Sequence, residues 1–240
     1  MKVMKKAKVE KVIEALAKEH DVYVPIQRGA QTGFFSYRTY NEDYDDIMLD
    51  TLNVYQPPKS IVFPQTEKMY GFKSEGQKIN IDQVFEESEP KIIFGLRSCD
   101  LKAIDYLDEL FFTKSYEDEF YRARRKSTVM IVNACYNPGT SCFCDSMGVS
   151  PNEPENADVL IHDIGEGDFA WEAKSDKGEA VTELIKDLLE EQEATLPTLK
   201  NFKRKVDYEG VAEKLKDMFD HPMWEDMSYP CHNCGICTYM

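Results

Sequence analysis

The sequence predicts an α/β protein, with an α+β arrangement as the alternative. The middle of the chain alternates continuous apolar runs with amphipathic helical patterns, which is the order of a parallel β-α-β unit. Three cysteines at three-residue spacing stand beside the C-terminus and match the start of the ferredoxin motif C-x2-C-x2-C-x3-C-P. We therefore expect a mixed-sheet α/β domain over residues 1–200. Residues 201–240 should form a helix-containing linker and the first part of a ferredoxin-like module.

The composition is typical of a globular protein and excludes several classes. Of 240 residues, 42% are hydrophobic and 30% are charged, which is enough apolar material for a core. The net charge of −15 opposes binding to nucleic acids, whose phosphates are also negative. No apolar run approaches the roughly 20 residues of a membrane-spanning helix. The charged N-terminus lacks the apolar core of a signal peptide, so we expect a cytoplasmic protein without membrane insertion.

The first eighty residues give mixed signals. Residues 4–19 should form a helix because Val9, Val12, Ile13 and Leu16 recur at helical spacing. Two strands should follow, at H-D-V-Y-V-P-I and T-G-F-F-S-Y-R-T-Y. Residues 41–50 should form a solvated acidic loop, and Y-Q-P-P-K-S-I-V-F-P an irregular proline-rich segment.

The central region gives the clearest pattern. K-I-I-F-G-L reads as a buried strand that passes through the turn R-S-C-D into a helix, with Asp100 placed to cap the helix. S-T-V-M-I-V-N-A reads as the next buried strand and leads directly into Cys135. Further strands are expected at A-D-V-L-I-H-D-I and D-F-A-W-E-A-K, joined by a hairpin turn, and further helices at 178–193 and 209–219.

The terminal cysteines Cys231, Cys234 and Cys237 indicate an iron–sulfur site. Their C-x2-C-x2-C spacing matches [4Fe–4S] ligation, whereas zinc sites generally use separated C-x2-C pairs. A zinc site and unliganded thiols remain the alternatives. The chain ends one residue before the motif calls for its next cysteine, so we expect the front portion of a longer protein. A natural terminus with another ligand is the alternative.

A second set of cysteines lies upstream, at Cys99, Cys135, Cys142 and Cys144. Cys99 and Cys135 follow predicted strands, and the carboxyl ends of neighbouring parallel strands meet at one edge of a sheet. Four thiolates suffice for one [4Fe–4S] or [2Fe–2S] cluster. In the alternative interpretation, Cys142 and Cys144 only form a turn and the other two pack in the core.

Arginines stand out in this acidic chain, at Arg97, Arg122, Arg124 and Arg125. We expect such charges to pair with surface carboxylates. The alternative is that they offset the negative charge of a cluster or of a flavin phosphate. Arg97, two residues before Cys99, is the candidate for cofactor binding.

Several segments together resemble a known family. They are P-P-K-S-I-V-F-P-Q-T-E, K-I-I-F-G-L-R-S-C-D-L-K-A-I-D-Y-L-D, D-E-F-Y-R-A-R-R, C-Y-N-P-G-T-S-C-F-C-D-S-M-G and C-H-N-C-G-I-C-T-Y. With them, the chain resembles the iron–sulfur subunits represented by the beta subunit of archaeal sulfhydrogenase and by the corresponding iron–sulfur subunit of anaerobic sulfite reductase.

The resemblance implies an electron-transfer subunit of an anaerobic redox complex. In that family an α/β domain precedes a module with two [4Fe–4S] clusters. The subunit passes electrons between a flavin- and NAD(P)-binding reductase subunit, which carries FAD, and a catalytic subunit of the hydrogenase or sulfite/sulfur reductase type. By resemblance, all seven cysteines are metal ligands, but the second half of the module is absent from this sequence. A zinc-bound scaffold subunit and a flavin-binding oxidoreductase subunit are the alternatives.

Overall fold

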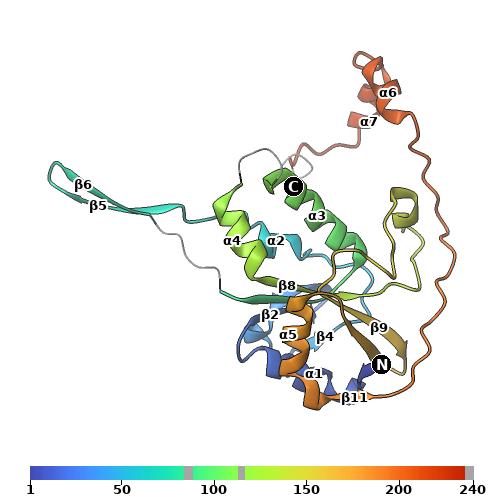
Figure 1. The fold of residues 1–240 in the computed structure, drawn as a ribbon. Coiled ribbons are helices and arrows are strands. Elements are labelled where there is room, and N and C mark those ends of the chain that lie inside the picture. The colour runs from blue at the N-terminus through green and yellow to red at the C-terminus, as the bar shows by residue number, and fades with distance from the viewer. Residues whose placement is uncertain (84–88, 113–116, 236–240) are drawn as a thin grey trace. The chain divides into compact units, whose positions relative to one another are not determined.

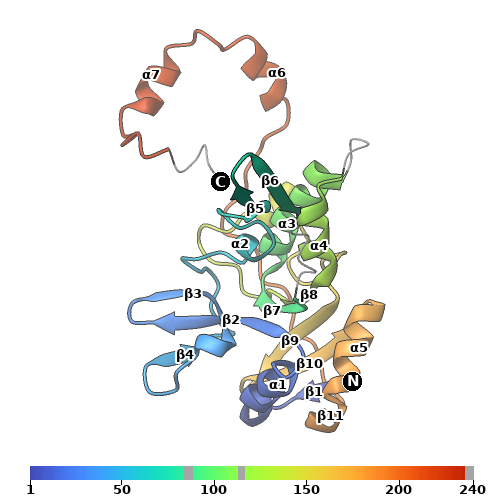
Figure 2. The ribbon, with the colours of Figure 1, turned by 90° about the vertical axis from the view of Figure 1, so that its left-hand side faces the viewer.

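The computed structural model describes residues 1–83, 89–112 and 117–235. The chain divides into two compact units, Met1–Lys205 and Val206–Met240. The first unit contains a mixed β-sheet with helices on both faces (Figures 1 and 2). The α/β class predicted from the sequence is therefore confirmed.

Nine strands form this sheet within the described residues, in the order β11-β1-β10-β9-β8-β7-β2-β3, with β4 also paired to β2. Four central strands, β2, β7, β8 and β9, are parallel to one another, and the outer pairings are antiparallel. The strands are β1 Lys2–Met4, β2 Asp21–Arg28, β3 Gln31–Ser36, β4 Asp45–Ile47, β7 Lys91–Leu96, β8 Thr128–Asn133, β9 Val159–Gly165, β10 Asp168–Ala173 and β11 Leu189–Glu191.

The α-helices of the first unit are short, apart from α3. They are α1 Val9–Leu16, α2 Lys59–Val62, α3 Ser98–Phe112, α4 Glu119–Ser127 and α5 Asp176–Leu184. Single 3₁₀ turns lie at η1 Lys6–Lys8, η2 Tyr37–Thr39, η3 Cys144–Met147 and η4 Lys186–Leu188.

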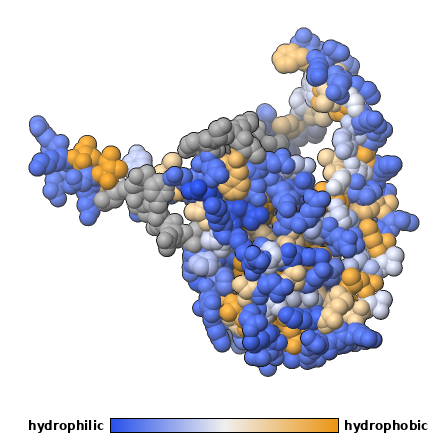
Figure 3. Space-filling model, viewed as in Figure 1, coloured by the Kyte–Doolittle hydropathy of each residue, from blue (hydrophilic) through white to orange (hydrophobic). Residues whose placement is uncertain are grey.

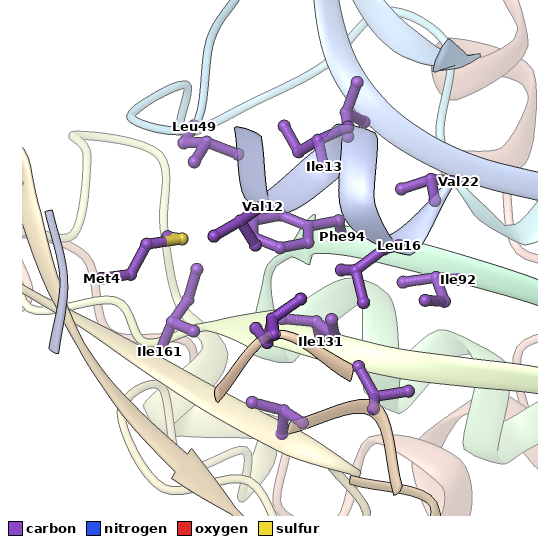
Figure 4. Packing of buried hydrophobic residues seen from close by; sticks show 14 of the residues in the cluster. Met4, Val12, Ile13, Leu16, Val22, Leu49, Ile92, Phe94, Ile131 and Ile161 are labelled. Atoms are coloured by element: carbon purple, nitrogen blue, oxygen red, sulfur yellow. The ribbon is translucent and has the colours of Figure 1, made fainter. Parts of the chain in front are cut away.

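Two hydrophobic clusters occupy the two faces of the sheet. Along β7, Ile92 and Phe94 belong to the cluster under α1 and α5, and Ile93 belongs to the cluster under α2, α3 and α4. Figure 4 shows the first cluster, in which Phe94 lies close to Val12 of α1. Because both faces are covered, the central strands are continuously apolar rather than alternating.

The predicted parallel unit is present as β7, α3, α4 and β8. The two strands pair in parallel, with Ile93 opposite Met130. The hairpin predicted between the next two strands is also confirmed, because β9 and β10 pair antiparallel around Gly165 and Asp168.

Two predictions about the flanking helices were wrong in their extent. The helix predicted for 4–19 covers only Val9–Leu16, because Lys2–Met4 form β1. The helix predicted for 178–193 ends at Leu184, and the chain continues as β11, whose backbone pairs with β1. Tertiary strand pairing thus overrides the helical pattern at both ends.

Three smaller corrections concern the start of a helix, a short strand and a single helical turn. Asp100 lies in the first turn of α3 and does not precede it, because the helix already begins at Ser98. The acidic segment 41–50 contains the short strand β4. The proline-rich segment contains one helical turn, α2. Pro57 and Pro58 precede this turn, so the backbone N–H groups of its own residues remain available for hydrogen bonds.

A separate two-stranded sheet lies between α2 and β7 in the chain. Its strands are β5 Tyr70–Glu75 and β6 Lys78–Gln83, and they pair only with each other within the described chain. Gly76 adopts a left-handed conformation, with φ of 63°, in the turn that joins them.

The second unit contains two short helices, α6 Val211–Lys216 and α7 Met223–Ser228. None of its described residues, 206–235, is buried. Phe219 and Tyr229 are 88% and 93% exposed. This part of the unit therefore has no hydrophobic core of its own.

Among the described residues, no helix has the length and apolar character needed to cross a membrane.

We predict that Gly178→Ala destabilises the first unit. A Cβ atom at Gly178 would overlap the carbonyl oxygen of Asp158, and a backbone atom cannot move aside easily. The free energy of unfolding, measured with urea, should fall by about 1–3 kcal/mol. Glu179→Ala, on the exposed side of the same helix, is the control and should change it by less than about 0.5 kcal/mol. Equal effects from both variants would contradict the packing argument.

Candidate metal centre

The structure brings the four upstream cysteines to one pocket. Cys99 lies in the first turn of α3, Cys135 lies two residues beyond β8, Cys142 lies in the following loop, and Cys144 begins η3. All four line a single small pocket together with Leu52, Asn53, Arg97, Ser98 and Pro151. Cys135 is buried, Cys142 and Cys144 are partly buried, and Cys99 is exposed.

Parallel pairing of β7 and β8 places the first two cysteines at the same edge of the sheet. The carbonyl oxygen of Pro151 then connects their two loops. It accepts hydrogen bonds from the Cys135 backbone N–H at 2.9 Å and from the Ser98 hydroxyl at 2.7 Å. Since Ser98 and Pro151 are both buried, these bonds are protected from water.

A tight turn holds Cys142. Its N–H donates to the carbonyl of Gly139 at 3.2 Å, and the Gly139 N–H donates to the Cys142 sulfur at 3.2 Å. The loop then passes through η3, which ends at Gly148 in a left-handed conformation. The Cys144 carbonyl accepts a hydrogen bond from Val149 at 3.0 Å. Backbone hydrogen bonds therefore already order the cysteine loop.

Arg97 fixes the loop that covers the pocket. Its Nε and Nη2 atoms donate to the Thr51 carbonyl at 3.1 and 2.9 Å, and Nη2 also reaches the Leu49 carbonyl at 3.3 Å. The Leu49 carbonyl also accepts a bond of 2.7 Å from the buried amide of Asn133. These bonds hold the segment that contributes Leu52 and Asn53 to the pocket.

Each of the other three arginines pairs with a carboxylate, although the side chains of Arg124 and Arg125 are largely buried. Arg122 pairs with Glu117 at 3.1 Å, Arg125 pairs with Asp108 at 2.9 Å, and Arg124 pairs with Glu67.

Arg97 differs from these three in its position, because its guanidinium donates to the Thr51 and Leu49 carbonyls beside the cysteine pocket. Arg124 also donates to a backbone carbonyl, that of Val62 at 2.8 Å, but it lies away from the lining of this pocket. A carbonyl neutralises no charge, so the positive charge of Arg97 acts on its surroundings, which include Cys135 and Cys99 as well as the carboxyl groups of Asp50 and Asp100.

Desolvation changes the pKa values of the side chains that line this pocket. It raises the pKa of the Cys99, Cys135 and Cys144 thiols, and at Cys135 the guanidinium of Arg97 acts in the opposite direction. Burial lowers the pKa of Arg97, while the neighbouring Cys135 and Cys99 raise it. The free thiols of Cys99, Cys135 and Cys144 are therefore protonated near neutral pH, and metal binding to them would release protons.

The side chains of metal-ligand type in this pocket are four cysteine thiols. Over the described residues, no three Cys, His, Asp or Glu side chains converge closely enough to hold one metal ion. A zinc ion needs four ligands around one point. Four cysteine thiols that line one pocket are the ligand type and the ligand number that one iron–sulfur cluster takes.

The terminal cysteines are only partly described. Cys231 and Cys234 are exposed, and Cys237 lies outside the described residues. Asn233 and Gly235 have positive φ angles of 53° and 72°, so the chain turns sharply on either side of Cys234. Exposed thiols on a sharply turning chain are accessible to a cluster. Cys231 and Cys234 belong to no group of three metal-ligand side chains within the described residues.

A larger pocket adjoins the cysteines. It has a volume of about 440 Å³ and shares Leu52, Arg97 and Cys135 with the cysteine pocket. Asn133 also lines it and is 2% exposed.

Sequence patterns did not identify three of the lining residues. Leu52, Asn53 and Pro151 lie in loops without a motif. Asn133 could have been noticed as a polar residue that ends an apolar strand.

The fold and the site together define an α/β protein that gathers four cysteines at the carboxyl edge of its parallel strands. Comparison with known proteins relates it to sulfhydrogenase 2 subunit beta of Pyrococcus furiosus. The two are 27% identical over 229 residues, which is 90% of this chain and 64% of that protein. The resemblance to the sulfhydrogenase beta subunits is thereby confirmed, although it does not establish the ferredoxin-like module. No family model matches the chain, and no solved structure matches it.

We predict that Gly139 and Leu52 are energetically coupled. A Cβ atom at Gly139 would lie 2.7 Å from Cδ2 of Leu52, so Gly139→Ala displaces the side chain that covers the cysteines. The variant should lower the free energy of unfolding of the metal-free protein by about 1 kcal/mol. Adding Leu52→Ala should recover part of this loss, because it removes the clashing atom. Strictly additive effects of the two substitutions in urea unfolding would contradict the contact.

Proposed function

We propose that this protein is an electron-transfer subunit of a redox complex of the hydrogenase or sulfur reductase type. The observation that carries the proposal is that Cys99, Cys135, Cys142 and Cys144, from separate segments, line one pocket. The related protein is named a sulfhydrogenase subunit, which supports membership of a multi-subunit complex. A [4Fe–4S] cluster fits four thiolates, and a [2Fe–2S] cluster is the alternative.

When bound, such a cluster would take up and release single electrons. The chain's own residues would control how readily this occurs. The four thiolates would hold the iron, and the Gly139 N–H would donate to the sulfur of Cys142. Arg97 would place a positive charge next to Cys99 and Cys135. Leu52 and Pro151 would keep water away from the thiolates.

The terminal cysteines are proposed to hold a second cluster. Cys231, Cys234 and Cys237 would be its ligands, as the first part of a ferredoxin-like module. The described part of this unit has no buried residue, so metal binding would supply folding energy that packing does not. The domain boundary at residues 200/201 also stays a prediction.

The partners remain part of the proposal. They are a flavin- and NAD(P)-binding reductase subunit, which would carry FAD, and a catalytic redox subunit, in the cytoplasm. An electron-transfer chain needs a donor and an acceptor, and in this proposal the substrate chemistry takes place on the partners. The identity of the catalytic partner would decide the terminal reaction.

One observation favours a second candidate, a flavin in the α/β domain itself. The pocket of about 440 Å³ lies at the carboxyl ends of β8 and β9, where α/β proteins commonly bind ligands. Its size is within the usual range for small-molecule sites. A yellow protein that releases free flavin on denaturation would support this candidate.

We predict that the anaerobically purified protein is brown and that dithionite bleaches its broad visible absorption. Cys142→Ser with Cys144→Ser should remove the iron of the upstream site, because half of its thiolate ligands are lost. Iron analysis and visible spectra measure both effects. Cys231→Ser with Cys234→Ser is the matched control and should leave the upstream iron in place. Colourless protein with stoichiometric zinc, or unchanged iron in the first variant, would contradict the proposal.

We further predict that Arg97→Gln lowers the reduction potential of the upstream cluster. Reduction adds a negative charge, which the guanidinium stabilises. Its loss should shift the potential down by roughly 50 mV, close to a tenfold change in the one-electron equilibrium. Potentiometric titration measures the shift. Arg97→Lys keeps the positive charge, so its reduction potential should stay close to that of the parent protein. An equal drop in both variants would mean that Arg97 only positions the loop.

A further inference from the structure

The β5–β6 hairpin has one apolar face. Strand pairing places Phe72 opposite Ile81, and Ser74 opposite Ile79, so these side chains share a face. Tyr70 lies on the same face, two residues before Phe72. The opposite face carries polar side chains at the alternating positions, which are Lys73, Glu75, Lys78 and Asn80. The hairpin is therefore amphipathic, as expected for strands that are covered on one side.

Within the described chain, however, nothing covers the apolar face. Tyr70, Phe72, Ile79 and Ile81 are 60%, 67%, 65% and 67% exposed. Figure 3 shows hydrophobic residues gathered on this hairpin, among hydrophilic neighbours. By contrast, apolar side chains of the main sheet are buried on both faces.

Exposed apolar strands of this kind are typical of a binding surface. An isolated two-stranded hairpin is marginally stable in water, and contiguous exposed apolar patches commonly mark interaction sites. The outer edges of β5 and β6 pair with no other strand in the part of the chain that is described. Their backbone N–H and C=O groups can therefore accept an additional strand.

A second copy of this chain is a poor occupant. The two strands contain 12 residues, and only half of them face the apolar side, whereas a standard interface uses roughly 20–30 residues a side. Two hairpins packed face to face would thus bury too little surface for a stable dimer. Residues 70–83 carry two lysines and two acidic residues, but a second copy would bring a further net charge of −15. Repulsion between the copies would oppose their association.

We propose that the β5–β6 hairpin inserts into an apolar groove of another subunit of the complex. The inference rests on the proposed function, since it names the surface by which this subunit would join a partner. A groove can contact the apolar face and the unpaired strand edges of the hairpin together, and so can supply backbone hydrogen bonds that a flat contact between two hairpins lacks. In this proposal the groove has an apolar floor for Phe72 and Ile81, while Lys73 and Lys78 on the opposite face stay on the solvent side.

The test uses the full-length chain purified together with its complex from the native host. A photo-crosslinking p-benzoylphenylalanine replaces either Phe72 or, as the matched control on the opposite face, Lys73. We expect position 72 to crosslink strongly to one stoichiometric subunit of the complex, and position 73 to crosslink far less. Mass spectrometry of the crosslinked peptides identifies the groove.

A second measurement uses substitutions. Phe72→Ser with Ile81→Ser should reduce the co-purifying subunit at least tenfold, which corresponds to about 1.4 kcal/mol. Lys73→Ser with Lys78→Ser should reduce it far less. Crosslinks between two copies, crosslinks within one chain, or equal effects on both faces would each overturn the proposal.

The iron content of the four-cysteine pocket, measured in the same samples, separates this proposal from the proposed function. Iron retained with the subunit lost is the expected result for the Phe72 and Ile81 variant. Iron absent from the parent protein would contradict the electron-transfer proposal, while the crosslinks would still test the docking surface. Loss of iron together with the subunit would show that the substitutions unfold the first unit, and it would overturn the assignment of the hairpin as a peripheral docking element.

Discussion

The parallel pairing of β7 with β8 is the constraint on which the rest of the first unit depends. Each strand is buried on both faces, so hydrophobic packing fixes its register against its neighbour. This register places the ends of the two strands at one edge of the sheet. Cys99 and Cys135 come together there, 36 positions apart in the sequence, without any local motif that joins them.

Irregular loops complete the pocket with hydrogen bonds to backbone carbonyls. Pro151 connects the start of α3 to the loop after β8, and Arg97 fixes the segment around Thr51. These hydrogen bonds connect the loops that carry the cysteines to the ends of the central strands. Side chains held by such bonds need less ordering when a ligand binds.

Two other parts of the protein lack such support. The β5–β6 hairpin exposes its apolar face, and the described residues of the second unit bury nothing. Short elements of this size cannot build a hydrophobic core. The protein thus combines a sheet that is buried on both faces with elements that have no buried core among the described residues.

The sequence by itself determined the α/β class, the central parallel unit and the terminal cysteine motif, because apolar periodicity and cysteine spacing are local signals. It did not determine β1 and β11, because their pairing joins the two ends of the first unit and overrides a helical pattern. Nor could it identify Leu52, Asn53 and Pro151 as neighbours of the cysteines, since loops carry no periodicity. Only the tertiary structure decided which residues surround the pocket, because hydrogen bonds between distant segments, such as Arg97 to Thr51, have no signature in the chain.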